Sequence, residues 1–434
     1  MQAISDHLFL SPEQARAVRA QFGTPVYIYH FSTLLAQAQQ ALEMPNAYGL
    51  TVRYAIKANP NKAFLQLFDR LGLHFDASSG YEVYRALRAG VAPEKIQLTA
   101  QELPEDLPEL VEQGVLFNAG SLSQLQRFGA LFPGREVSIR VNPGRGSGHS
   151  RRTNVGGPLS PFGIWHEHLD SARAIAAAYR LRITRLHSHV GSGADPDVWR
   201  QCAALTVALA HDLPAVRRVN LGGGFKVARM PGEPGTDLPE VGAAIARVLR
   251  DFREADAARR DLHLEIEPGA FLVANAGALL CTVIDVKDTG RQGERFTVLD
   301  GGMNDLLRPT LYGAQHPIWI ISGDGAERAA NDFIVVGHCC ESGDIFTPAP
   351  GKPEEIQPRR LPAPQIGDIA IVGGAGAYGA AMGAANYNSF PRSAELLLTP
   401  DGELHVVRRR QALEEVVAGE QPLAEIDGWE TAGL

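Results

Sequence analysis

The sequence predicts an α/β fold: a (β/α)8 barrel followed by a C-terminal, mostly antiparallel β domain. Short apolar runs typical of buried strands occur eight times before residue 270, and helical patterns alternate with them. Beyond about residue 272, helical patterns become scarce and β-rich runs replace them. We therefore place the barrel at 28–271 and a β-rich domain at 1–27 and 272–434. An open doubly wound sheet is the alternative fold.

The individual elements of the predicted barrel follow from the spacing of apolar residues. Its eight strands are expected at 52–58, 73–77, 96–100, 115–119, 137–142, 183–190, 216–221 and 262–267. Its helices are expected at 62–71, 81–89, 122–131, 169–179, 198–213 and 238–252. Before the first of these strands, the pattern predicts a short helix near 11–16, a strand at 25–29 and a helix at 31–42.

The predicted β domain rests on a different pattern. Strand-like runs occur at 282–286, 296–299, 333–336 and 369–372. Two further runs, 394–398 and 404–407, flank Thr399-Pro-Asp-Gly402, whose residues favour a hairpin turn. We expect 351–355 and 361–364 to be surface loops.

Composition argues against several classes of partner. The net charge of −8 disfavours nucleic acid and anionic membrane surfaces, which require a basic patch. No run of 18 apolar residues is present, and the first residues lack the basic start of a signal peptide. The four cysteines form no C-x-x-C pair, so we expect a reducing, cytoplasmic setting.

Polar residues follow the predicted strands where each one ends. The active sites of such barrels lie at the C-terminal ends of the strands. We therefore expect one site built from several strand ends. These residues are Lys57, Asp76, Asn142, His187, His189, Gly222, Gly223, Gly224 and Glu267.

Lys57 follows a buried strand and precedes Asn59-Pro60-Asn61. One interpretation is a lysine whose stem packs on the core while its ammonium reaches water. The other is a partly desolvated amine with a lowered pKa, able to form a Schiff base with a carbonyl cofactor.

The glycine run 222–224 allows close approach of an anion to backbone N–H groups, although a tight turn also requires glycine. Gly191-Ser192-Gly193 adds a second flexible loop with a hydroxyl. In barrels, the loops after the late strands commonly hold phosphate, so we expect an anion site here.

His187 and His189 have a spacing of two, so their rings point to the same side of the strand. No third ligand accompanies them, and we predict no metal site. His189 is expected to lie flat against another ring; a core histidine is the alternative. Glu265 and Glu267 alternate through an apolar run, so at least one carboxylate points inward and needs a partner, such as a pyridinium nitrogen.

Residues 374–379 match the dinucleotide-binding pattern G-x-G-x-x-G after a strand. Such a site also requires a helix and a second parallel strand. Here the run 387–391 breaks any helix, and a hairpin follows. We therefore reject a nicotinamide cofactor.

Taken together, these motifs resemble the fold type III pyridoxal-phosphate decarboxylases, the family of diaminopimelate, ornithine and arginine decarboxylases. The similarity covers nearly the whole chain, and 304–312 and 386–392 look most like the diaminopimelate branch. The matching segments are 54–59, 75–80, 140–143, 187–192, 222–225, 267–269, 340–344 and 376–378.

The resemblance implies the cofactor pyridoxal 5′-phosphate, held covalently by Lys57, with His189 on its ring and Glu267 at its nitrogen. Asp76 joins the cofactor site, and Cys340 is the candidate proton donor. The phosphate would be held by Ser192, Gly223, Gly224, Gly269 and Tyr378. The distal end of the substrate would meet Arg308, Tyr312, Glu341 and Tyr378. The segment 340–344 would reach a neighbouring subunit, which implies a homodimer with shared active sites.

One position departs from the family. The usual Glu-Pro-Gly-Arg reads Glu267-Pro268-Gly269-Ala270 here, so a bidentate anion contact is lost. Arg151 or Arg152, in a basic loop after the fifth strand, is a candidate replacement; equally, both are solvated.

The resemblance implies decarboxylation of meso-diaminopimelate to L-lysine. The alternatives are decarboxylation of another or a conjugated amino acid such as a siderophore precursor, an amino-acid racemase, and a non-catalytic protein that binds the cofactor.

Overall fold

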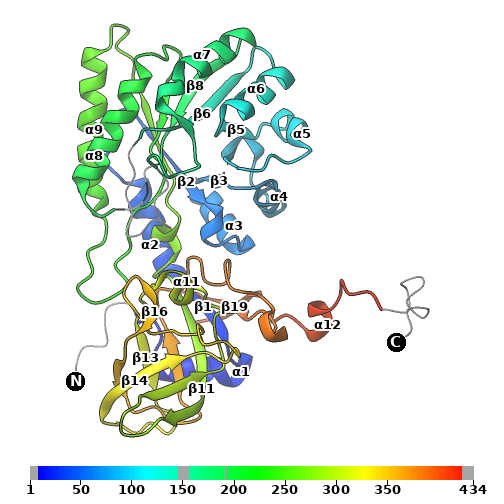
Figure 1. Cartoon of the computed structure of the whole chain (residues 1–434), viewed down its shortest axis with the longest axis vertical. Helices are drawn as coiled ribbons and strands as arrows, with labels where there is room; N and C mark the ends of the chain where they lie inside the picture. The colour runs from blue at the N-terminus through cyan, green and yellow to red at the C-terminus, as the bar shows by residue number, and fades with distance from the viewer. Residues whose placement is uncertain (1–7, 145–155, 190, 192, 423–434) are drawn as a thin grey trace.

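The computed structural model describes residues 8–144, 156–189, 191 and 193–422. It confirms the predicted α/β fold, with a parallel barrel above a mostly antiparallel sheet in Figure 1. The barrel strands run in the order β5-β4-β3-β2-β10-β9-β8-β6, and pairing of β5 with β6 closes the ring. These strands are β2 (Leu50–Ala55), β3 (His74–Ala77), β4 (Ile96–Leu98), β5 (Leu116–Ala119), β6 (Glu136–Asn142), β8 (Arg182–His187), β9 (Arg218–Asn220) and β10 (His263–Ile266). A short strand, β7 (Ile164–Trp165), pairs with the end of β6.

Helices cover the outside of the barrel. Several begin with a side chain that accepts a hydrogen bond from a backbone N–H of the first turn, including Asn61, Ser79, Ser121 and Asp237. These caps fix where each helix begins after its strand. The helices are α2 (Phe31–Leu42), α3 (Lys62–Arg70), α4 (Gly80–Ala89), α5 (Leu107–Glu112), α6 (Leu122–Leu131), α7 (Leu169–Ala178), α8 (Pro196–Ala210), α9 (Leu238–Ala255) and α10 (Ala270–Val273).

The hydrophobic core lies between the strand wall and these helices. For example, the ring of Tyr54 on β2 lies 4.7 Å from that of Phe68 on α3, and Phe117 on β5 stacks on Phe128 of α6 at 5.0 Å. Apolar residues of the strands therefore face outward, which leaves the alternate positions for the interior of the barrel.

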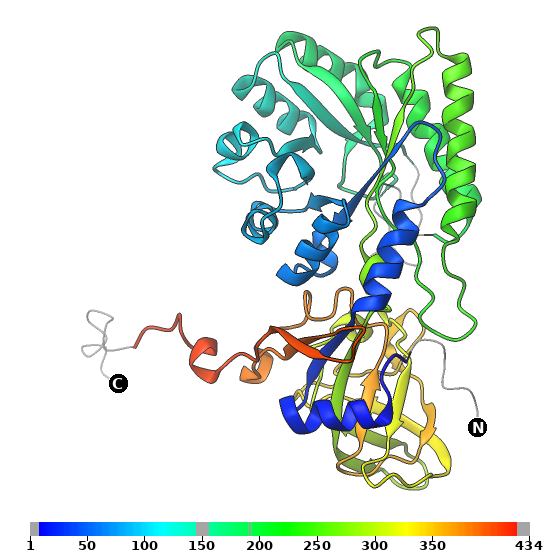
Figure 2. The same ribbon diagram turned by 180° about the vertical axis from the view of Figure 1, so that it is seen from behind.

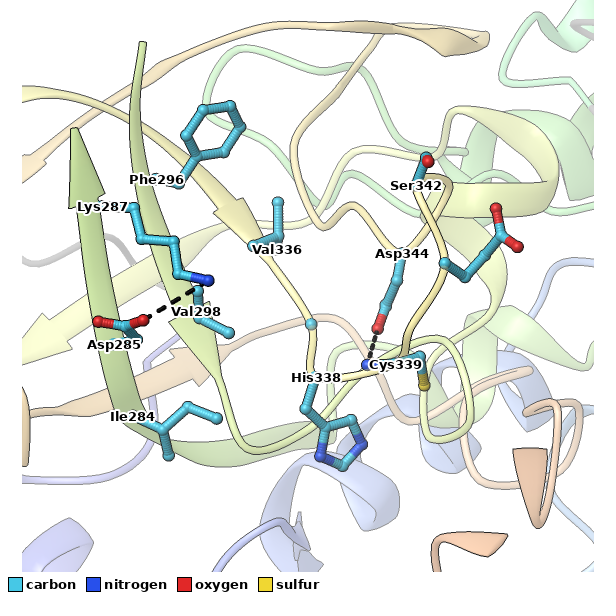
Figure 3. Close-up of a pocket in the computed structure, with 12 residues that line it drawn as sticks. Ile284, Asp285, Lys287, Phe296, Val298, Val336, His338, Cys339, Ser342 and Asp344 are labelled. Carbon is cyan, nitrogen blue, oxygen red and sulfur yellow. Dashed lines mark hydrogen bonds and ion pairs between the residues drawn. The ribbon is translucent and has the colours of Figure 1, made fainter. Parts of the chain in front are cut away.

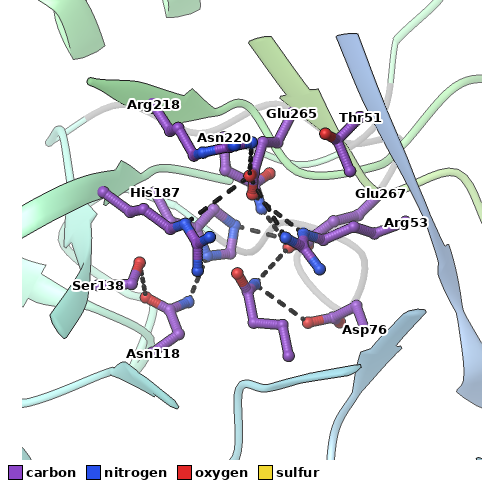
Figure 4. Close-up of polar contacts among 12 residues, drawn as sticks. Thr51, Arg53, Asp76, Asn118, Ser138, His187, Arg218, Asn220, Glu265 and Glu267 are labelled. Atoms are coloured by element: carbon purple, nitrogen blue, oxygen red, sulfur yellow. Dashed lines mark hydrogen bonds and ion pairs between the residues drawn. The ribbon is translucent and has the colours of Figure 1, made fainter. Parts of the chain in front are cut away.

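That interior is polar. Near the N-terminal ends of the strands, the fully buried Arg53 contacts Glu265 at 3.0 Å and 3.3 Å (Figure 4). Burial opposes ionisation of Glu265, but the guanidinium groups of Arg53, Arg185 and Arg218 lower its pKa to about 2. Unlike a barrel filled with branched apolar side chains, this one is held together inside by ion pairs and hydrogen bonds.

The second sheet runs in the order β17-β14-β12-β11-β1-β19-β20, and β13 and β18 continue it from β11. Its strands are β1 (Val26–His30), β11 (Gly277–Asp288), β12 (Arg295–Leu299), β13 (Ile318–Ile321), β14 (Ala330–Val336), β17 (Arg359–Pro362), β18 (Ile369–Val372), β19 (Ala394–Leu398) and β20 (Leu404–Arg408). β1 lies in the middle of this sheet, and α2 carries the chain from it to the barrel (Figure 2). β1 therefore pairs with strands of the second sheet, and the barrel strands begin with β2.

Most predicted elements are found, and two expectations were wrong. The eight barrel strands, the helix at 31–42 and the β19–β20 hairpin are present, and the helix predicted near 11–16 extends over α1 (Pro12–Phe22). The predicted loops at 351–355 and 361–364 instead overlap β16 (Lys352–Ile356) and β17. β16 is polar, mostly exposed and paired with the two-residue β15 (Pro348–Ala349), so it has no apolar alternation to reveal it.

Two further observations concern the surface. Among the described residues, no helix is long and apolar enough to cross a membrane. Beyond β20, the described chain projects away from both bodies and includes α12 (Leu413–Val416) (Figures 1 and 2). Leu413 in this helix is exposed.

Candidate active site

Lys57 lies on a single 3-10 turn (Ile56–Ala58) directly after β2. Its side chain is exposed, and Tyr378, Asp76 and Glu267 are near enough to the amine to act on its charge. Burial lowers the pKa of Lys57, but the opposing attraction of Tyr378, Asp76 and Glu267 exceeds it, and the pKa is raised. The lowered pKa expected from the sequence is therefore wrong, because acidic groups face the amine.

Asp76 and Glu267 form a pair of buried carboxylates at the ends of β3 and β10 (Figure 4). The amide of Gln97 bridges them, donating to Glu267 Oε1 at 3.1 Å and to Asp76 Oδ1 at 3.5 Å. Burial, together with repulsion from Glu267, raises the pKa of Asp76 to about 7, and burial also raises the pKa of Glu267. Near neutral pH the pair therefore retains part of a proton.

Hydrogen bonds fix the orientation of Glu267. Asn220 Nδ2 donates to its Oε1 at 2.6 Å, and Nε2 of His187 lies 3.5 Å from its Oε2. Asn118 holds the ring of His187 through a 2.7 Å contact with Nδ1. Burial keeps the pKa of His187 well below its usual value, so the ring is neutral. Asn220, His187 and Asn118 thus form a polar layer that holds the carboxylate of Glu267 in place.

The glycine run forms the wall beside this layer. A Cβ at Gly222 would lie 2.6 Å from the ring of His189, and one at Gly223 would collide with the carbonyl of Glu267. Only glycine allows the backbone to pass here. Nδ1 of His189 is buried and has no hydrogen-bond partner among the described residues, so it remains free for a ligand.

The β domain supplies the opposite side. The backbone N–H of Tyr378 donates to the carbonyl of Ala58 at 2.8 Å, next to Lys57. The guanidinium of Arg308, on α11 (Arg308–Tyr312), lies 5.9 Å from the ring of Tyr378 and 6.0 Å from that of Tyr312. A Cβ at Gly269 would lie 3.5 Å from the hydroxyl of Tyr378. The two bodies therefore share one site.

A comparison with protein families identifies the chemistry of this site. Residues 31–274 match the model of the pyridoxal binding domain of pyridoxal-dependent decarboxylases, which is more than half of the chain. The chain belongs to the pyridoxal-dependent decarboxylase family. This confirms the resemblance on which the predicted roles rest, and a carbon–carbon lyase that uses pyridoxal phosphate follows from it.

Individual decarboxylases agree along nearly the whole chain. The diaminopimelate decarboxylase of Streptomyces coelicolor is 39% identical, with 93% of this chain and 91% of the relative covered. The diaminopimelate decarboxylase of Escherichia coli K12 is 36% identical, with 94% of this chain and 96% of the relative covered. Among solved structures, one diaminopimelate decarboxylase has a TM-score of 0.86 at 35% identity, over 96% and 98% of the two chains. The Helicobacter pylori enzyme complexed with L-lysine has a TM-score of 0.81 at 27%, over 93% and 98%.

The residues present fit a pyridoxal group. An accessible amine faces two carboxylates, one of which stands on a polar layer, and an imidazole with a free nitrogen lies against a glycine wall. These are the groups that a carbonyl, a ring nitrogen and a flat ring require. The arrangement of Lys57, Asp76, His189, Gly223 and Glu267 is therefore compatible with such a group.

Several predicted site residues are not joined to this cluster. Cys340 and Glu341 are exposed on the loop 337–344, and within the described part of one chain neither has a hydrogen bond or ion pair to Lys57 or Glu267. Asn142 has a structural role, since its side chain binds the backbone of Gly144 and Gly157. Ser192, Arg151 and Arg152 lie outside the described residues.

Other residues of the site were missed from the sequence. Gln97, Asn118 and Asn220 occupy inward positions of predicted strands, where a polar residue within an apolar run was the available signal. Arg140 is half-buried near Asp76 and Glu267, and its guanidinium lies over the ring of Phe162 at 4.9 Å. Arg229 lies in a segment without regular secondary structure, where no periodic pattern marks it.

Two negative expectations concern other cofactors. After β18 the chain forms turns instead of the helix that a dinucleotide site requires, and β18 pairs antiparallel with β11 and β13, so the nicotinamide interpretation fails. Within the described ranges, no group of three or more His, Cys, Asp or Glu residues is placed to hold a metal ion.

The raised pKa of Asp76 predicts a pH-dependent stability. A carboxyl that titrates near pH 7 when folded and near 3.8 when unfolded binds its proton more tightly in the folded state, so stability falls as pH rises between those values. In protein stripped of cofactor, Asp76→Asn should therefore raise the free energy of unfolding at pH 8 by about 2–4 kcal/mol. Urea denaturation at pH 8 and pH 4 measures this. An equal gain at both values would contradict it.

Proposed function

We propose that this decarboxylase converts meso-diaminopimelate to L-lysine and CO₂. The observation that carries the proposal is the agreement over more than nine-tenths of the chain with diaminopimelate decarboxylases of two bacteria, at 39% and 36% identity. Arg308 and Tyr312, close to Tyr378 and therefore to Lys57, support it, because the substrate carries a second amino-acid group at its far end.

Each residue of the site has a part in this reaction. The bound cofactor supplies the electron sink that makes loss of CO₂ possible. Lys57 would hold the cofactor covalently and give way to the substrate amine, Glu267 would interact with its ring nitrogen, and His189 would lie against its ring. The phosphate would be held by Gly223, Gly224 and Gly269, together with Ser192 and Tyr378. Gln97 donates to both Asp76 and Glu267 and holds the two carboxylates next to each other.

Hydrogen-bond donors surround the carboxylate of Glu267. Asn220 and Gln97 both donate to its Oε1, and its Oε2 faces Nε2 of His187. His187 is neutral and therefore adds no positive charge beside Glu267. Cys340 of a neighbouring subunit, or Lys57, returns a proton to the substrate carbon.

A second candidate is decarboxylation of another or a conjugated amino acid, and Ala270 favours it because the family's arginine is missing there. Purified protein given a panel of amino acids, with CO₂ release measured, separates the two. We expect release from meso-diaminopimelate at least about 100-fold faster than from L-lysine or L-ornithine. No release from meso-diaminopimelate would end the proposal. Epimerised substrate without CO₂ indicates a racemase, and no turnover of any substrate indicates a non-catalytic protein.

We also propose a cytoplasmic homodimer in which each active site takes residues from both subunits. Cys340 and Glu341 are exposed beside an open hollow of about 620 Å³ lined by β11, β12 and the loop 337–344 (Figure 3). Asp344 fixes this loop by accepting from the backbone of Met303 at 2.7 Å and of Cys339 at 2.8 Å. A rigid, exposed loop is suited to complete a neighbour's site. The four free cysteines support a reducing compartment.

Complementation between inactive variants tests the shared site. Lys57→Ala and Cys340→Ala remove groups that, in the proposed dimer, belong to the same site but to different subunits. Mixing equal amounts after reversible dissociation should restore about a quarter of the wild-type activity, because half of the dimers are mixed and each has one intact site. A mixture no more active than its two components would show that one chain supplies both groups.

A further inference from the structure

We propose that Arg229, together with Arg308, binds the substrate carboxylate that lies far from the reacting carbon. Arg229 thereby replaces the arginine that the family carries at the position of Ala270. This inference rests on the proposed function, because it assumes a substrate with a second carboxylate.

The backbone around Arg229 is held against the active site. Asn275, just beyond α10, donates to the carbonyl of Ala228 at 2.9 Å. Glu233 Oε2 accepts from the backbone N–H of Arg229 at 3.0 Å and of Met230 at 3.2 Å. This part of the segment between β9 and α9 is therefore fixed to the helix that begins with Ala270.

The side chain of Arg229 then crosses to the β domain. Its Nε donates to the carbonyl of Gly374 at 3.1 Å. Gly374 has φ +61°, and a Cβ there would lie 3.0 Å from Cδ and from Cγ of Arg229. Glycine at 374 thus permits both the turn and the close passage of the arginine.

The guanidinium groups of Arg229 and Arg308 each keep a nitrogen without a hydrogen-bond partner among the described residues. These are one terminal nitrogen of Arg229 and Nε of Arg308, and both are buried. Burial and the charge of Arg308 lower the pKa of Arg229 to about 9. Glu233 is an acidic residue close to Arg229. Its carboxylate already accepts from two backbone N–H groups and lies 3.4 Å from the ammonium of Lys226.

A carboxylate is the ligand that this arrangement fits. Two neighbouring cations with free donors are stabilised by an anion that accepts from both, and a guanidinium fork matches the two oxygens of a carboxylate. Tyr378 places the pair beside the reaction site: the Arg308 guanidinium lies over its ring, and Gly269, which precedes Ala270, adjoins its hydroxyl. The methyl group of Ala270 provides no donor, so Arg229 supplies the charge from the opposite segment.

The test compares L-lysine with cadaverine, which differs only by lacking that carboxylate. Isothermal titration calorimetry on the cofactor-loaded enzyme gives both dissociation constants. Arg229→Gln should weaken L-lysine about 30-fold or more and leave cadaverine within about threefold. Equal weakening of both ligands, or a loss below threefold for L-lysine, would overturn the proposal.

Lys226→Gln is the matched control, because it removes one positive charge from the same segment. We expect Lys226→Gln to leave both dissociation constants within about threefold. If it weakens L-lysine binding as much as Arg229→Gln does, the effect comes from net charge, and the proposed contact between Arg229 and the carboxylate is wrong. Arg229→Lys gives a second measurement if glutamine impairs folding. Arg229→Lys should weaken the binding of L-lysine at least about fivefold and leave the binding of cadaverine unchanged.

Restoring the family's arginine tests the replacement directly. The double variant Arg229→Gln/Ala270→Arg should recover at least about tenfold in L-lysine affinity over Arg229→Gln. Failure to recover would overturn the equivalence of the two positions. These measurements need no turnover: absence of CO₂ release from meso-diaminopimelate would end the proposed function, whereas an Arg229-dependent preference for L-lysine would stand.

Discussion

Lys57→Ala is expected to reduce decarboxylase activity at least about 10⁴-fold and to remove the visible absorption band of the loaded enzyme. Lys57 is the exposed amine on which Asp76 and Glu267 act, and a methyl group in its place can neither attach the cofactor nor exchange with the substrate amine. CO₂ release from saturating meso-diaminopimelate measures the activity, and the visible absorption spectrum of the loaded protein measures the band.

Lys62→Ala is the matched control for this loss. Lys62 is exposed at the start of α3, five positions further along the chain. The control should keep both the band and the activity within about twofold. A band that persists in Lys57→Ala and disappears in Lys62→Ala would move the site of attachment and remove the basis of the proposed reaction.

The second large effect is expected for Glu267→Gln, with kcat reduced about 10²–10⁴-fold. Glutamine retains the volume of Glu267 and an acceptor for Asn220 and Gln97, but it cannot place a negative charge at the ring nitrogen. The affinity of the protein for cofactor should change far less than kcat. Steady-state kinetics and a cofactor titration of the same preparation separate the two quantities.

Glu265→Gln provides the comparison, because it removes the same charge two positions earlier on the same strand. Glu265 faces Arg53 in the lower layer of the barrel. Its replacement should lower the free energy of unfolding by about 3 kcal/mol, since Arg53 is left unpaired, and should leave kcat of the folded enzyme within about threefold. If Glu265→Gln costs as much in kcat as Glu267→Gln, the two layers are not functionally distinct.

The sequence was sufficient for the barrel because its strands obey a simple rule. Their apolar residues pack outward against helices, and turns separate them at regular intervals. The β domain was harder to predict where pairing is not accompanied by burial. β16 consists mainly of polar, exposed residues, and nothing in its own sequence distinguishes it from a loop.

The site divides in the same way. The positions of Lys57, Asp76 and Glu267 were predictable because each lies at or just beyond the C-terminal end of a strand, and barrel geometry brings these ends together. Arg229 was not, because its position depends on contacts with Gly374 and Asn275, which come from parts of the chain far from it in sequence. The pKa of Lys57 was mispredicted for a related reason: its sign depends on how many acidic groups surround the amine, and a sequence does not give that number.

The polar interior of the barrel limits how this enzyme can acquire a new specificity. Asn118, Gln97 and Asn220 each satisfy a neighbour's donor or acceptor, so one exchange leaves others unpaired. Selection for a new substrate is therefore expected to change the residues proposed to meet the distal end of the substrate, such as Arg229 and Arg308, while the interior remains the same in enzymes of different preference.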